Sequence, residues 1–402
     1  MHSSHGVPRW LLLVAAMAAI GPVSIDMYLP GFPAIEREFG VRGVETTMAA
    51  YLVGIAVSQL FYGPISDRFG RKPPLYFGFA LYALGAAGCA LASSMPALTL
   101  MRVVQALGGS AGFVIGRAIV RDRCEPHEAA RAFSLLMMIA ALGPVLAPVA
   151  GGFVVTHFGW RGTFVFQVAL GLVLLAATHF ALRESRPESA VTPLNLASVL
   201  RTYVRLCKDR VLVGYSMVGG FGMGALFSYV TGAPTVLTQR YELSPQQFGL
   251  LIGLNGLAFM TASRLNMIAL RTMGPRQILG RYVWMPVLLG AALLALTSLW
   301  PVPLWMVVAL QLSFFVTVGR VTPHVAALAL APHGAEAGAA SALMGALQSS
   351  LAMLNGFAVA TFNDGTVSTL AAIMTAGGAL TLASYLWVGA ASQSQEGLRR
   401  SG

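Results

Sequence analysis

The sequence predicts an all-α membrane protein of twelve transmembrane helices in two six-helix bundles, and three observations support this fold class. Of the 402 residues, 56% are hydrophobic and only 10% are charged, whereas soluble proteins carry about 25% charged residues. Twelve apolar runs are long enough to cross a bilayer, which takes about 20 residues each. One longer polar segment divides these runs into two sets of six. The composition therefore excludes a soluble enzyme, a secreted disulfide scaffold and a disordered chain.

The first apolar run decides whether the chain starts with a signal peptide. Arg9 precedes an apolar stretch with small residues, as in a secretory signal. The stretch continues past the possible cleavage site to Pro30, so we interpret it as a retained helix. The predicted spans, in chain order, cover residues 9–30, 46–66, 74–94, 97–119, 132–155, 162–182, 211–236, 246–264, 281–300, 304–327, 337–362 and 367–390.

The basic residues set the expected orientation of these spans. With the N-terminus in the cytoplasm, 19 of the 26 Lys and Arg residues fall in cytoplasmic segments and four on the opposite side. Such a bias over short loops is the positive-inside signal. The net charge of +11 is thereby explained by membrane orientation, so no nucleic-acid partner is expected. Arg102, Arg117 and Arg320 fall inside spans; Arg117 can snorkel to the interface, and the sequence assigns no role to Arg320 or His324.

The connection between spans six and seven is the one long loop, and it divides the chain into domains. We expect a bundle over 1–185, a cytoplasmic linker over 186–210 and a second bundle over 211–402. Such a plan places a binding site between the halves near the middle of the membrane. The three cysteines, Cys89, Cys124 and Cys207, have no metal-binding spacing, so we expect free thiols.

The loop between spans two and three carries a particular motif, Gly63-Pro-Ile-Ser-Asp67-Arg68-Phe-Gly70-Arg71-Lys72. Gly70 permits a tight turn with positive φ. The spacing G-x-x-x-D-R-x-G-R-K resembles the signature loop of the major facilitator superfamily. Taken alone, its charges are solvated loop charges, and exposed ion pairs contribute only about 0–1 kcal/mol. The resemblance implies instead a conformational latch made by Gly63, Asp67, Arg68, Gly70, Arg71, Lys72 and Asp122.

Other segments resemble the Bcr/CflA branch of drug:proton antiporters over nearly the whole chain. Two departures are Ala106, which stands where the branch usually has glycine, and His324, which stands where relatives often have asparagine. The resemblance implies the bacterial inner membrane as location. The matching segments are Asp26-Met-Tyr28-Leu-Pro30, Arg102-Val-Val-Gln105, Arg121-Asp122 and Gly338-Ala-Ala-Ser341.

Span five contains the glycines and prolines of an antiporter-like motif. Small residues let helices approach closely, and proline bends a helix. One interpretation is a kink that faces lipid. We favour a bent, closely packed helix at the central cavity, which limits leak when the cavity is empty. The motif residues are Gly143, Pro144, Pro148, Gly151 and Gly152.

Asp26 is the single acidic residue that lies well inside a predicted span. A carboxylate in hydrocarbon costs about 2.5–3.5 kcal/mol, so it persists where it is paired or used. Arg102 is at a matching depth in span four and can pair with it. One alternative is a static ion pair between the two spans. The functional hypothesis is a proton site, in which protonation of Asp26 and binding of substrate exclude each other.

The leading hypothesis for function is a proton-coupled exporter of small amphipathic compounds such as drugs. No cofactor or metal is expected, and the absence of a P-loop motif indicates that the proton gradient supplies the energy. Alternatives are a transporter of a sugar, amino acid or nucleobase and, disfavoured because its spans hold no catalytic constellation, a membrane-embedded enzyme. Both halves in one chain suggest a functional monomer. Expected cavity residues are Tyr28, Tyr51, Gln59, Met137, Phe227, Tyr229, Asn255 and Gln348.

Overall fold

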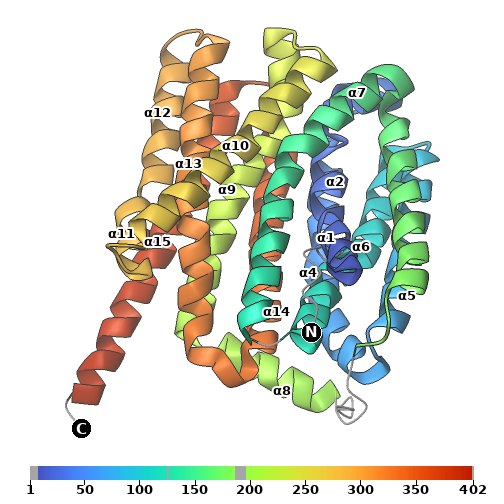
Figure 1. The fold of residues 1–402 in the computed structure, drawn as a ribbon. Coiled ribbons are helices and arrows are strands. Elements are labelled where there is room, and N and C mark those ends of the chain that lie inside the picture. Colours follow the sequence, from blue (N-terminus) through green and yellow to red (C-terminus); the bar gives the residue numbers. More distant parts are fainter. Residues whose placement is uncertain (1–7, 125, 186–195, 401–402) are drawn as a thin grey trace.

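The computed structural model describes residues 8–124, 126–185 and 196–400, and it is built almost entirely of long helices that run side by side (Figure 1). The first half contains α1 (Arg9–Ala18), α2 (Ile20–Asp26), η1 (Leu29–Gly31), α3 (Phe32–Phe39), α4 (Glu45–Phe69), α5 (Lys72–Ala90), α6 (Met95–Arg123) and α7 (Pro126–Ala181). The second half contains α9 (Arg210–Tyr241), α10 (Pro245–Ala269), α11 (Pro275–Tyr282), α12 (Met285–Leu299), α13 (Leu304–Leu330), η3 (Ala331–Glu336), α14 (Ala337–Phe362) and α15 (Val367–Arg400).

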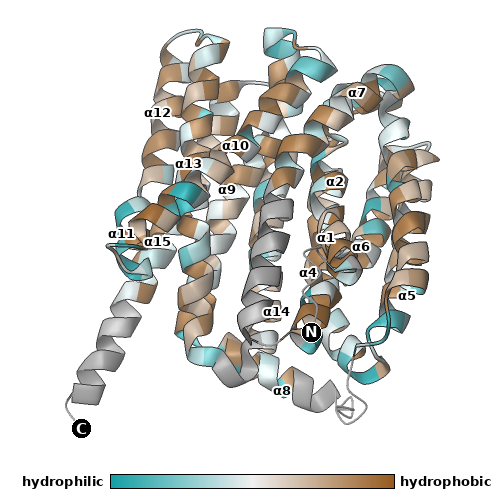
Figure 2. Cartoon of the chain, in the orientation of Figure 1, coloured by the Kyte–Doolittle hydropathy of each residue, from teal (hydrophilic) through white to brown (hydrophobic). Residues whose placement is uncertain are grey.

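The twelve-span fold is confirmed, although ten helices of the described chain are long and apolar enough to cross a membrane. One of the ten, α7, leaves helical geometry at Gly159, where φ is 70° and ψ is 175°. The chain reverses there, so α7 is two spans joined by a tight turn (Figure 1). The remaining span is α5, which packs between α6 and α7. In Figure 2 hydrophobic residues cover most of the long helices, whereas hydrophilic residues gather at connections.

The first span is longer than the sequence predicts. The helical path does not end at Pro30 but continues through η1 and α3 to Phe39. Pro30 and Pro33 fall in the first turns of η1 and α3, where the missing N–H costs nothing because those donors have no helical partner. The interruption lies earlier, at Met27 and Tyr28, directly after Asp26.

The two halves meet along two seams. Helix α4 packs against α14, and α7 packs against α10. Between the halves in sequence, α8 (Leu196–Cys207) lies across one end of the molecule (Figure 1). Its Tyr203 hydroxyl donates to the Leu60 carbonyl at 3.2 Å. The segment predicted as a linker thus contains a helix that contacts the first half.

Close helix packing in the first half depends on Gly108. A Cβ at this position would overlap the backbone nitrogen of Tyr82 and the carbonyl oxygen of Gly78, both on α5. Backbone cannot move aside as a flexible side chain can, and overpacking of this kind costs about 1–3 kcal/mol.

We therefore expect Gly108→Ala to lower the melting temperature of the detergent-solubilised protein. Gly21→Ala is the matched control, because nothing lies within 4 Å of its added Cβ. Thermal unfolding followed by tryptophan fluorescence measures both variants. Equal melting temperatures for the two would show that the α5–α6 contact relaxes without cost.

Candidate functional site

A cavity of about 1070 Å³ lies between the two halves. Among the residues expected there, Gln59 of α4, Phe227 of α9 and Gln348 of α14 line it. A Cβ at Gly345 of α14 would overlap the Gln59 carboxamide oxygen, so the two halves touch at this glutamine. The wall includes Gly63 and Asp67 from the end of α4 and Thr202 from α8. The cavity therefore reaches the end of the bundle that carries the signature loop.

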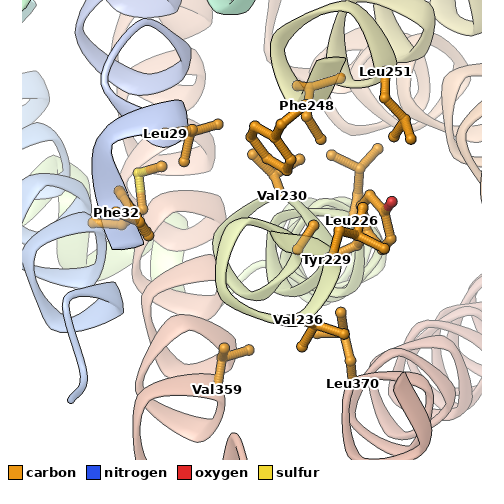
Figure 3. Close-up of a cluster of buried hydrophobic side chains, with 14 of the residues drawn as sticks. Leu29, Phe32, Leu226, Tyr229, Val230, Val236, Phe248, Leu251, Val359 and Leu370 are labelled. Atoms are coloured by element: carbon orange, nitrogen blue, oxygen red, sulfur yellow. The ribbon is translucent and has the colours of Figure 1, made fainter. Parts of the chain in front are cut away.

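At the opposite end the halves are sealed by a buried hydrophobic cluster. Leu29, which is 0% exposed, points toward α9 and α10 of the other half, where Val230 and Phe248 lie (Figure 3). The same buried cluster contains Phe32 of the first half and Leu226, Tyr229, Val230, Phe248 and Leu251 of the second half. Apolar side chains packed in this way exclude water. The molecule is therefore hollow toward one end and closed at the other.

Asp26 is the last residue of α2 and is 8% exposed, so it faces neither lipid nor bulk water. Within residues 8–124, 126–185 and 196–400, no hydrogen bond or ion pair involves its carboxyl group. It is not among the residues that line the cavity. Any link between this acid and a bound molecule must therefore run through the helices around it.

Arg102 is completely buried and is held by aromatic rings. Its guanidinium carbon lies 4.1 Å from the ring centre of Tyr51, 4.4 Å from Tyr28 and 5.8 Å from Phe164. Its Nη1 donates to Gln105 Oε1 at 2.7 Å, while Nε and Nη2 have no hydrogen-bond partner among the described residues. The rings stabilise the charge by cation–π attraction. The structure does not pair Arg102 with Asp26.

A chain of amides links Arg102 to the helix that carries Asp26. Gln105 Nε2 donates to Gln167 Oε1 at 2.6 Å, and Gln167 Nε2 reaches the Val23 carbonyl at 3.5 Å. Val23 lies three residues before Asp26. The sequence motif contains Gln105, but Gln167 lies in an apolar run where no pattern marks it. The connection becomes visible only when α6, α7 and α2 are packed together.

The span-five motif lies between Asp26 and the second half. A Cβ at Gly151 would overlap the Met27 carbonyl oxygen, and one at Gly143 would press on Pro22. On the other side, a Cβ at Gly152 would lie 2.6 Å from the carbonyl oxygen of Pro245 in α10. Within the same stretch, Pro144 is partly buried and Pro148 packs against Gly249 of α10. This part of α7 therefore touches both the Asp26 segment and the other half.

The signature loop forms a charge cluster around Arg71, which is 3% exposed. Arg71 donates to Asp67 Oδ1 at 2.6 Å and to Asp122 Oδ2 at 2.7 Å. Burial works against the charge of Arg71, but its hydrogen bonds to Asp122 and Asp67 raise its pKa above the ordinary value. The cluster ties α4, α5 and α6 together at the open end of the cavity.

Other loop residues shape and close this corner. Gly70 adopts a φ of 88°, and the Glu184 carboxylate accepts hydrogen bonds from the backbone N–H groups of Arg71 and Lys72. Such a carboxylate satisfies the free donors at the start of α5. The sequence does not predict Glu184, because it lies 112 residues from its partner. Arg68 is exposed on the last turn of α4.

The remaining expected cavity residues lie elsewhere. Tyr28 and Tyr51 surround Arg102, Tyr229 packs in the sealed cluster, and Asn255 Oδ1 accepts a hydrogen bond from Gln311. Met137 lies in α7 outside the residues whose side chains are described. Tyr51 and Tyr229 lie on α4 and α9, which contribute to the cavity wall, but their side chains turn into packed interiors; Tyr28 and Asn255 lie on segments outside the described wall.

Arg320 and His324 are buried within the second half. The Arg320 guanidinium carbon lies 3.9 Å from the ring centre of Tyr282, and His324 follows one turn later on α13. Among the described side chains, no group of three His, Cys, Asp or Glu residues could hold a metal ion. None of the three cysteines, all within described segments, forms a disulfide.

Glu45 is a buried acid that lies one residue before the predicted span 46–66. It is 2% exposed at the sealed end. Asn363 Nδ2 donates to Glu45 Oε1 at 2.8 Å, and Thr235 Oγ1 lies 3.4 Å from the same oxygen. Both partners belong to the second half. Its position in the first turn of α4 gives no signal of this contact, which depends on how the halves meet.

Comparison with known proteins gives a family and several relatives. Residues 12–359 match the family model described as Major Facilitator Superfamily. The chain is 35% identical over 353 residues to "Uncharacterized MFS-type transporter YdgK" of Bacillus subtilis, covering 86% of this chain and 88% of the relative. It is 28% identical over 382 residues to "Bicyclomycin resistance protein homolog" of Haemophilus influenzae, covering 94% and 96%. It is 28% identical over 344 residues to "Multidrug resistance protein MdtL" of Escherichia coli, covering 85% of each.

Solved structures share the fold at low sequence identity. A bacterial homolog of the human lysosomal transporter Spinster, in an inward-facing and occupied conformation, matches with a TM-score of 0.73 and 14% identity. That match covers 95% of this chain and 96% of the other. A D-xylose–proton symporter matches with a TM-score of 0.70 and 16% identity, covering 94% and 96%. These similarities confirm the two-bundle fold of twelve helices.

Proposed function

The chain belongs to the major facilitator superfamily, and on that basis we propose that it is a proton-coupled exporter of small amphipathic compounds. Family membership makes it a multi-pass membrane transporter rather than an enzyme, and the relatives named for bicyclomycin and multidrug resistance confirm the resemblance to the Bcr/CflA branch. The proposal concerns what is carried, in which direction and by what energy. It places the chain in the bacterial inner membrane with both termini cytoplasmic, working as a monomer.

The observation that carries the proposal is the buried Asp26, which has no partner among the described residues and lies beside the helix that touches both halves. Burial disfavours a charged carboxylate, so we expect this acid to hold a proton in this conformation. Two nitrogens of Arg102, Nε and Nη2, also have no hydrogen-bond partner among the described residues, and the amide chain links that side chain to α2. A rearrangement of α2 that brings the two charges together would favour release of the proton.

Coupling in this proposal acts through helix packing. Asp26 does not line the cavity, so a proton and a cargo molecule do not need to occupy the same space. The α7 motif touches Met27 on one side and Pro245 on the other. A shift of the Asp26 segment therefore changes the seam between α7 and α10. Rocking of the two halves would then close the cavity at the signature-loop end and open the sealed end.

The polarity of the cavity suits drug-like cargo. Glutamine side chains Gln59 and Gln348 stand among apolar groups such as Leu52, Phe227 and Ala352. Pockets that bind amphipathic molecules combine an apolar lining with a few polar groups. The domain assignment follows the same plan, with bundles over 1–185 and 211–402 and a cytoplasmic linker over 186–210.

The test is transport by the purified protein in proteoliposomes with an imposed pH step. We expect fluorescent amphipathic compounds to move against their gradient while the pH step lasts, and a protonophore to abolish this movement. A panel of sugars, amino acids and nucleobases runs in parallel. Gradient-driven movement of one of these metabolites, with no movement of the amphipathic compounds, would contradict the proposal and favour a metabolite transporter.

A further inference from the structure

One arginine projects into the cavity without an acidic partner. Arg117 of α6 lines the cavity and its side chain is exposed. In the part of the chain that the structure describes, it makes no hydrogen bond or ion pair. Its guanidinium carbon lies 4.1 Å from the ring centre of Phe113, which is one turn deeper in the cavity and 37% exposed. The sequence suggested that Arg117 snorkels to the membrane interface; the structure turns it toward the cavity instead.

Among the described residues, the cavity wall carries one positive charge that no acid pairs with, on Arg117. The described lining residues include two that carry a charge, Arg117 and Asp67. The Asp67 carboxylate is held by Arg71 at 2.6 Å, an arginine that it shares with Asp122. Arg117 has no acidic partner among the described residues. Because low-dielectric protein surrounds the wall, its charge interacts with other charges over several ångströms. An anionic group on a cargo molecule would be attracted to the Arg117 charge, whereas a cationic group would be repelled by it.

We propose that Arg117 and Phe113 form a specificity site for aromatic cargo that carries an anionic group, such as a carboxylate, sulfonate or phenolate. The guanidinium offers several N–H donors in a plane that matches such groups. Phe113 offers a ring face for the aromatic part. Both lie on the side of the cavity near Asp67, where cargo enters from the signature-loop end. This inference rests on the proposed function, because it names the class of compound that the exporter selects.

Two xanthene dyes of similar shape test the inference by binding alone. Fluorescein is an anion near pH 8, and a rhodamine ester is a cation. We expect the detergent-solubilised protein to bind fluorescein about tenfold more tightly, measured by fluorescence anisotropy. Arg117→Gln should remove this preference, whereas Arg117→Lys should keep it in part. The matched control is Arg68→Gln, which removes an exposed positive charge at the same end of the molecule.

The outcomes separate this inference from the function itself. A wild-type preference for the cationic dye, or an unchanged preference in Arg117→Gln, overturns the specificity site even if both dyes are transported. A binding preference that follows Arg117, without any gradient-driven transport, supports the site and contradicts the exporter. Loss of preference in Arg68→Gln would show a general charge effect and overturn the assignment to Arg117.

A second inference rests on a different place, the sealed end of the molecule. Glu45 of α4 is buried there against Asn363 and Thr235 of the other half. A small cavity of about 90 Å³ adjoins the group, and its wall also contains Glu36 and Arg42. We infer that the Glu45–Asn363 contact is an outer latch, which holds the closed end shut while the cavity is open.

Accessibility of Cys124 reports the state of this latch without reference to transport. Cys124 lines the cavity and is partly exposed, whereas Cys89 is fully buried. In a Cys207→Ser background, maleimide labelling of Cys124 measures how often the cavity is open. We expect Glu45→Ala and Asn363→Ala to slow labelling severalfold, because release of the outer end lets the cavity close. The double variant should be no slower than either single one.

Asp364→Asn is the matched control, because its exposed carboxylate sits beside the latch but bonds to Thr366 within its own loop. Its labelling rate should equal that of the parent. Glu45→Gln keeps the shape of the side chain and gives the answer if alanine prevents folding. Unchanged labelling in Asn363→Ala and Glu45→Gln, or an equal fall in Asp364→Asn, overturns the latch.

Discussion

Proteoliposomes that contain Asp26→Asn should lose pH-driven uphill transport and keep downhill movement of cargo. Asparagine preserves the size of the side chain but cannot bind and release a proton. The buried position of Asp26, without a partner in the described structure, makes this the group most able to exchange a proton in the first half. Because Asp26 lies outside the cavity wall, cargo binding should persist. Asp26→Asn should therefore abolish cargo accumulation and change the affinity for cargo only slightly.

Three measurements distinguish a loss of proton coupling from a general loss of transport. Dye accumulation under a pH step gives uphill transport, dye exchange without a step gives downhill movement, and a pH indicator inside the vesicles gives proton entry on addition of cargo. Asp26→Glu keeps a titratable group and should retain part of the uphill transport. If Asp26→Asn still accumulates dye under a pH step, Asp26 has no part in coupling. If exchange is also lost, its role is structural.

Arg71→Ala should destabilise the protein by about 3–5 kcal/mol, the range found when one partner of a buried ion pair is removed. The substitution leaves the nearly buried Asp122, whose side chain is 9% exposed, without its cation. It also frees Asp67 and loosens the junction of α4, α5 and α6 at the open end of the cavity. Arg71→Lys should recover part of the loss, because lysine keeps the charge but not the planar set of donors.

Thermal unfolding in detergent measures this effect, with Arg68→Ala as the exposed control from the same loop. A double-mutant cycle with Asp122→Ala tests the contact itself. Neighbouring residues in one ion-pair network do not contribute additively, so the double variant should lose less than the two single variants combined. Additive losses, or an Arg71→Ala protein as stable as Arg68→Ala, would mean that the cluster contributes no more than a surface pair.

The sequence predicted the architecture because the bilayer leaves few choices. Backbone groups in hydrocarbon must be satisfied within a helix, so each apolar run of sufficient length becomes a span. The basic residues and the long connection after residue 182 then divide the spans into two halves. Even the reversal inside α7 falls between the predicted spans 132–155 and 162–182. The first span was wrong in extent, because Pro30 and Pro33 start new turns and do not end the path.

Single residues were predictable where rarity marks them. An acid within an apolar run, as at Asp26, is costly enough to be noticed. The charges of the signature loop were found by their spacing, and the structure brings Asp67, Arg71 and Asp122 into one cluster. A residue such as Glu184, which meets this cluster from more than a hundred positions away, has no local pattern to reveal it.

The spans, their division into two sets of six and the one deeply placed acid follow from the hydropathy of consecutive residues. The tertiary structure alone decided which side chains meet. It put Arg102 among aromatic rings, turned Arg117 into the cavity, moved Tyr229 and Asn255 into packed interiors and buried Glu45 against Asn363. A helix carries side chains all around its axis, so the sequence alone does not say which of them face a neighbouring helix. Its rotation and the closed end of the bundle are set by packing against other helices, which hydropathy along the chain does not encode.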